Sequence, residues 1–96
     1  MNQTTQTRRK QQQPLTGEAM AWTRGLAGAL ATMQRCWHTS DLVVQVLREQ
    51  GLRLDDLLDC DVPDADLRHV FDAHVSHGNA EQKARAMQLL EQLQES

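Results

Sequence analysis

With 96 residues, the chain is long enough for one domain and too short for two. Its 40% hydrophobic residues include only two Trp, one Phe and no Tyr, so the core must consist mainly of Leu, Val, Ala and Met, which favours helices over strands. No apolar run approaches the roughly 20 residues that span a bilayer, and the sequence shows no secretory signal pattern. We therefore expect Cys36 and Cys60 to be reduced, the protein to be cytoplasmic, and no contact with a membrane.

The net charge of −3 is unevenly distributed. Arg8, Arg9 and Lys10 stand in a polar segment that has no apolar residue between Met1 and Pro14. Such a segment has nothing to bury against a core. We therefore predict a disordered basic tail over residues 1–15, followed by a single helical domain over residues 16–96.

The first predicted helix follows Thr16, which can cap it, with Glu18 near the positive end of the helix dipole. Apolar residues recur at helical spacing along it and predict a core-facing stripe: Trp22, Leu26, Ala29, Leu30, Met33 and Trp37.

A second stripe on this helix contains only small residues, Ala21, Gly25, Gly28 and Thr32. Glycine inside a helix costs about 1 kcal/mol relative to Ala, so two of them on one line suggest that another backbone approaches closely. That backbone belongs either to another helix of this fold or to a second copy of the chain. These four residues are our candidates for a homodimer interface.

Two shorter helices are expected next. Thr39 or Ser40 can cap a helix over residues 41–50, and Gly51 fits the left-handed position that ends it. We expect its inward residues to be Leu42, Val43, Val46 and Leu47. A third helix, over residues 54–60, should bury Leu57 and Leu58 and leave Asp55, Asp56 and Asp59 outside.

Pro63 marks the start of a fourth helix and Gly78 its end. Asn79 and Gln82 have the spacing of a capping box that opens a fifth helix. The expected inward residues are Leu67, Val70, Phe71, His74 and Val75 of the fourth helix, and Ala86, Met87, Leu90 and Leu93 of the fifth, with Leu89 at the margin. Loops of two to five residues then predict an all-α fold, a compact bundle of four to five short helices.

Metal binding and catalysis find little support in the sequence. Cys36 with His38, and His74 with His77, are the closest approaches to the paired spacing of zinc ligands, and His74 is better explained as a core histidine bonded to a carbonyl. No nucleophile motif or phosphate loop is present. We expect no cofactor, no metal and no enzyme activity.

The most unusual feature is an acidic block: residues 51–78 contain seven Asp against Arg53 and Arg68. Asp is common in turns and at helix starts, but a fixed anionic patch also steers and docks a basic partner. The candidate partner-binding residues are Asp55, Asp56, Asp59, Asp64 and Asp66. The sequence thus favours a non-enzymatic interaction module, an adaptor, chaperone-like or inhibitory protein that docks a basic protein surface.

Two alternatives involve nucleic acid. A phage-type inhibitor could use the same carboxylates to imitate nucleic-acid charge. A helix-turn-helix-like DNA-binding regulator could instead use the turn at Gly78, to which the resemblance is loose. Its candidate contacts are Arg8, Arg9 and Lys10 of the tail, and Gln82, Lys83 and Arg85 of the fifth helix.

Overall fold

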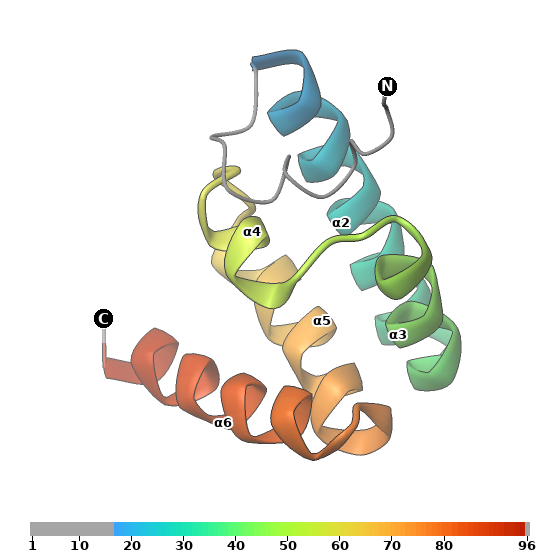
Figure 1. Ribbon diagram of the computed structural model, residues 1–96, viewed down its shortest axis with the longest axis vertical. Coiled ribbons are helices and arrows are strands. Elements are labelled where there is room, and N and C mark those ends of the chain that lie inside the picture. Colours follow the sequence, from blue (N-terminus) through green and yellow to red (C-terminus); the bar gives the residue numbers. More distant parts are fainter. Residues whose placement is uncertain (1–16, 96) are drawn as a thin grey trace, which may run out of the picture.

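Short turns connect five helices along residues 17–95, the part of the chain that the computed structural model describes (Figure 1). No strand occurs within these residues, so the predicted all-α class is confirmed. The predicted tail, residues 1–15, and the capping residue Thr16 lie outside the described range. The helices are α2 (Gly17–Trp37), α3 (Ser40–Glu49), α4 (Leu54–Leu58), α5 (Asp64–His77) and α6 (Ala80–Glu95).

Helix α5 forms the centre of the bundle and contacts each of the other four helices. In Figure 1, α2 and α3 lie on one side of it, and α6 crosses its C-terminal end. Phe71 and Val70 of α5 are fully buried. The other helices surround them with aliphatic side chains, which include Ala27, Leu30, Val43, Leu47, Leu57, Ala86 and Leu89.

Local signals set the ends of the helices. Gly51 has φ +69°, and the amides of Gly51 and Leu52 donate to the carbonyls of Arg48 and Leu47 at 3.0 Å each. This pair of bonds is the Schellman arrangement that follows a helix, and it confirms the prediction at Gly51.

The start of α6 is also as predicted. The Asn79 amide donates to Gln82 Oε1 at 2.9 Å, and the Gln82 amide donates to Asn79 Oδ1 at 2.8 Å. This reciprocal capping box satisfies two amides that a helix start leaves without partners. Pro63 precedes α5 directly, in agreement with its predicted role.

The predicted core stripe of α2 is confirmed in part, because the helix is turned by about one residue from the expected orientation. Leu30 is buried, and Leu26 and Met33 are partly buried against the core, whereas Trp22, Ala29 and Trp37 are exposed. The buried residues of α2 are Thr23, Ala27, Leu30, Ala31 and Gln34. Ala27 and Ala31 are small enough to let α2 approach α5 closely. Of the two buried polar residues, Gln34 donates from Nε2 to Ser40 Oγ at 2.8 Å, while its Oε1 is buried without a hydrogen-bond partner among the described residues. Thr23 is buried beside Cys60.

Three more predicted core residues are exposed: Leu42, Leu58 and Met87. The same helices bury other residues: Val43, Val44 and Leu47 of α3, Leu54 and Leu57 of α4, and Ala86 and Leu89 of α6. On α6 the buried line contains Ala86 and Leu89 instead, so Leu89 belongs to the centre of the stripe and Met87 to its outer edge.

Candidate interaction surfaces

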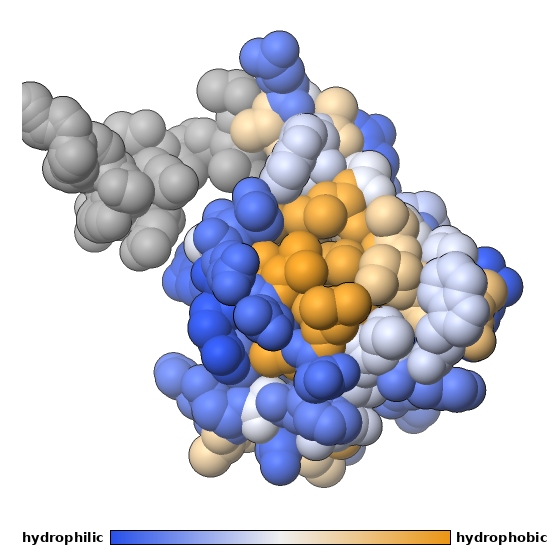
Figure 2. Space-filling model, turned by 90° about the vertical axis from the view of Figure 1, so that its right-hand side faces the viewer, coloured by the Kyte–Doolittle hydropathy of each residue, from blue (hydrophilic) through white to orange (hydrophobic). Residues whose placement is uncertain are grey.

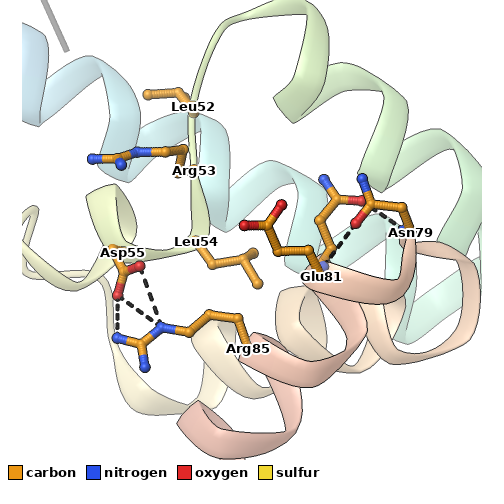
Figure 3. A pocket seen from close by; sticks show the side chains of 8 residues that line it. Leu52, Arg53, Leu54, Asp55, Asn79, Glu81 and Arg85 are labelled. Atoms are coloured by element: carbon orange, nitrogen blue, oxygen red, sulfur yellow. Dashed lines mark hydrogen bonds and ion pairs between the residues drawn. The ribbon is translucent and has the colours of Figure 1, made fainter.

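Asp55 is held by an ion pair that joins α4 to α6. Arg85 approaches its carboxylate with two nitrogens, Nη2 at 2.6 Å from Oδ1 and Nε at 3.2 and 3.3 Å from the two oxygens. The pairing raises the pKa of Arg85 above its ordinary value, through the hydrogen bonds and the charge of Asp55. Figure 3 shows the pair at one end of a pocket of about 370 Å³ between the α3–α4 connection and the start of α6.

Asp56 and Asp66 are also turned toward their own protein. Asp56 Oδ2 accepts a hydrogen bond from the Arg53 amide at 2.8 Å and so caps α4. Asp66 Oδ2 comes within 3.6 Å of the position that a Cβ atom on Gly28 would occupy, so it faces α2. Of the five predicted partner-binding carboxylates, Asp55 and Asp56 therefore make polar contacts inside the fold, and Asp66 lies beside α2.

Asp59 and Asp64 are exposed at the two ends of the α4–α5 connection, and Asp61 is exposed between them. Buried Cys60 and Val62 alternate with these residues and fix the connection to the core. Asp61 has φ +58°, which turns the chain sharply there. We call Asp59, Asp61 and Asp64 the acidic corner; neither of the two ion pairs found among residues 17–95 involves it.

The residues predicted to contact nucleic acid also differ: two make contacts inside the fold, and one is exposed. Gln82 caps its own helix and Arg85 is bound to Asp55, while Lys83 is exposed. The other candidates, Arg8, Arg9 and Lys10, lie outside the described residues.

The small-residue stripe of α2 lies at the surface. Ala21, Gly25 and Thr32 are exposed and Gly28 is half-buried. The Thr32 hydroxyl donates to the Gly28 carbonyl at 3.0 Å, a bond within the helix. A Cβ atom added at Gly25 would meet nothing within 4 Å, so no helix of the described fold approaches this glycine.

One surface was not predicted from the sequence: the side of α2 that was expected to face the core and is partly exposed instead. Trp22 is 54% exposed and Trp37 is 67% exposed, and Ala29 between them is exposed. Leu26 and Met33 are half-buried, with one side packed against the core and the other open to solvent. We call these five residues of α2 the apolar face. Figure 2 shows apolar side chains gathered on the side of the molecule where α2 and α3 lie. The helical spacing of these residues is visible in the sequence, but spacing alone does not distinguish an exposed apolar face from a core-facing one.

The groups considered for metal or nucleophilic chemistry differ in their exposure to solvent. His74 is buried, and its Nδ1 donates to the Val70 carbonyl at 2.9 Å, which confirms its predicted role as a core histidine. Cys36 is exposed and Cys60 is buried, both as free thiols. Burial raises the pKa of Cys60, which keeps this thiol protonated and unreactive. Within residues 17–95, no three His, Cys, Asp or Glu side chains gather as metal ligands would.

None of the helices in residues 17–95 combines the length and apolar character required to cross a membrane. No protein-family model, curated protein or solved structure matches this chain.

Proposed function

We propose that the protein is a non-enzymatic interaction module that associates with other proteins through helical surfaces. The observation that carries this proposal is the apolar face of α2, where two tryptophans are more than half exposed. A Trp side chain buries 150–250 Å² when covered, so covering the exposed half of each would contribute about 2 kcal/mol at 25 cal/mol per Å². Trp is also enriched among the residues that dominate binding energy at protein interfaces.

The acidic corner supplies the second part of the proposal, a preference for a basic partner. Its three carboxylates are exposed on a connection that buried Cys60 and Val62 anchor. Charges that are fixed before binding lose little freedom on association. They also raise the association rate with a cationic surface, in a way that salt weakens. The corner replaces the broader five-residue patch that the sequence suggested.

Capture from cells of the native host tests both parts. Four baits are compared: the wild type; a face variant, Trp22→Gln with Trp37→Gln; a corner variant, in which Asp59, Asp61 and Asp64 become Asn; and a control variant. Asn suits Asp61 because it tolerates positive φ. The control removes three exposed carboxylates elsewhere, through Asp41→Asn, Glu49→Gln and Glu91→Gln.

Proteins captured specifically by the wild type and the control should be lost by the face variant. The corner variant should capture less, and the captured protein should carry a basic surface. If all four baits retain the same proteins in the same amounts, neither surface takes part in binding and the proposal fails.

A mobility-shift titration with duplex DNA separates this function from the DNA-binding alternative. A DNA-binding protein loses affinity steeply as salt rises, because each neutralised phosphate releases counterions. We expect no shift at any salt concentration, since Arg85 is paired with Asp55 and Gln82 caps its own helix. A salt-sensitive shift that Lys83→Gln weakens would support the regulator instead.

A further inference from the structure

The positions of the residues on the apolar face are symmetric along α2. Trp22 and Trp37 lie equally far on either side of a midpoint between Ala29 and Leu30, and so do Leu26 and Met33. Bulky side chains are therefore at the two ends, about 22 Å apart at 1.5 Å per residue. The small residue Ala29 is at the centre.

This symmetry is what a two-fold interface between identical helices requires. In such an interface the same surface serves both partners, so residue i meets j and j meets i. An antiparallel copy of α2 would place Trp22 against Trp37 of the partner and the exposed part of Leu26 against that of Met33. Ala29 of each copy would lie beside the axis, about half a residue from it along the helix. The spacing of four, three and four residues from Trp22 to Met33 is also that of a coiled-coil seam.

We propose that a second copy of this chain covers the apolar face, with the two α2 helices antiparallel about a two-fold axis beside Ala29, the exposed residue at the centre of the face. The inference rests on the proposed function and names the occupant of one of its surfaces. It places the dimer interface on a different side of α2 from the small-residue stripe considered in the sequence.

Charge supports this arrangement. Arg24 and Arg35 of α2 lie roughly half a turn around the helix from the apolar face, at 100° per residue, so like charges do not meet at the interface. Asp66 of α5 lies beside Gly28, which is about 140° from the centre of the face. The acidic start of α5 is thus on another flank of α2 and stays uncovered.

The rest of the sequence offers no better occupant. Residues 1–16 contain only Met1, Pro14 and Leu15 as apolar residues, too few to match a face with two tryptophans. A second α2 presents the same large apolar residues in complementary order.

Cysteine cross-linking tests the axis directly. In a Cys36→Ser background, Ala29→Cys places one thiol beside the proposed axis in each copy, and Cys60 does not interfere because it is buried. Gly25→Cys in the same background is the matched control, because that position is exposed and has open space at Cβ. It belongs to the small-residue stripe, and thiol labelling checks that both cysteines are accessible.

Under mild oxidation, the Ala29→Cys protein should form a disulfide-linked dimer of twice 10.9 kDa much faster than the Gly25→Cys protein. Preferential cross-linking through Gly25→Cys would overturn the proposal in favour of the small-residue stripe. Equally slow cross-linking of both proteins would also overturn the proposal, because it would mean that the disulfides form only through random collisions.

Sedimentation velocity on a dilution series supplies an independent measurement. The wild type should dissociate reversibly, and Trp22→Gln with Trp37→Gln should weaken self-association roughly a hundredfold or more. Helical circular dichroism should be unchanged because both side chains are largely exposed. A wild type that is monomeric at every concentration overturns the dimer. If the same two substitutions still abolish capture of another protein, the proposed function survives that result.

Discussion

His74 is a titratable side chain that the fold keeps neutral. It is 1% exposed, and burial lowers its pKa below the ordinary value near 6.5. Its hydrogen bond to the Val70 carbonyl requires a proton on Nδ1, which the neutral ring provides.

The lowered pKa predicts a loss of stability in acid. Below about pH 6.5 the unfolded chain takes up a proton on this ring that the folded protein does not, so the free energy of unfolding falls as the pH falls. The loss stops only once the pH passes the folded pKa. His74→Asn keeps a donor for Val70 but removes the titration.

Urea unfolding at a series of pH values is the measurement. From about pH 7 to about pH 5, the free energy of unfolding should fall less steeply for His74→Asn than for the wild type. At higher pH the variant should be less stable by about 1–3 kcal/mol, because Asn fills the site incompletely. Parallel pH profiles for the two proteins would show that His74 does not titrate differently on folding.

The Asp55–Arg85 pair should behave as a partly exposed ion pair. Its side chains are half-open to solvent, so salt screens their attraction and the contribution to stability is small. We expect Asp55→Asn to lower the melting temperature slightly in dilute buffer and hardly at all in concentrated salt. Glu91→Gln, at an exposed position of α6, is the control for the loss of one carboxylate. A large decrease that salt does not change would mean that the pair acts through packing.

At the scale of the helix, two glycines predict opposite effects of the same substitution. Gly51 has φ +69° with open space at Cβ, so Gly51→Ala should cost about 1–2 kcal/mol through backbone conformation alone. Gly25 lies inside α2 and also has open space, so Gly25→Ala should stabilise by about 1 kcal/mol. Thermal unfolding of the two variants measures both signs. A stabilising effect at Gly51 would contradict the assigned turn.

The helix ends were predictable from sequence, and the orientation of the helices was not. Gly51, Pro63 and the Asn79–Gln82 pair act on atoms a few residues away, so their effects are local. Which edge of an apolar stripe meets the core depends on the neighbouring helices. On α2, Gln34 is buried where Ser40 accepts a hydrogen bond from it and Thr23 is buried beside Cys60. No periodicity of α2 itself contains that information.

At the scale of the molecule, the fold divides the acidic block into structural and exposed groups. Asp55 joins α4 to α6 and Asp56 caps α4, although in the sequence both look equivalent to Asp59. The division follows from tertiary position, because Arg85 is 30 residues from Asp55 along the chain. The composition of the block was visible in the sequence; the smaller corner is visible only in the folded protein.

The two proposed surfaces together predict avidity. A dimer through the apolar face would carry two acidic corners, and two linked contacts release from a dense surface far more slowly than one. We expect the wild type to dissociate from a densely coated polylysine sensor at least about tenfold more slowly than Trp22→Gln with Trp37→Gln. On a sparsely coated sensor the two proteins should dissociate at the same rate, because only one acidic corner of each dimer finds a site.

The corner variant should bind weakly at both densities. If the wild type and the face variant dissociate equally fast from the dense sensor, the dimer does not present its corners together.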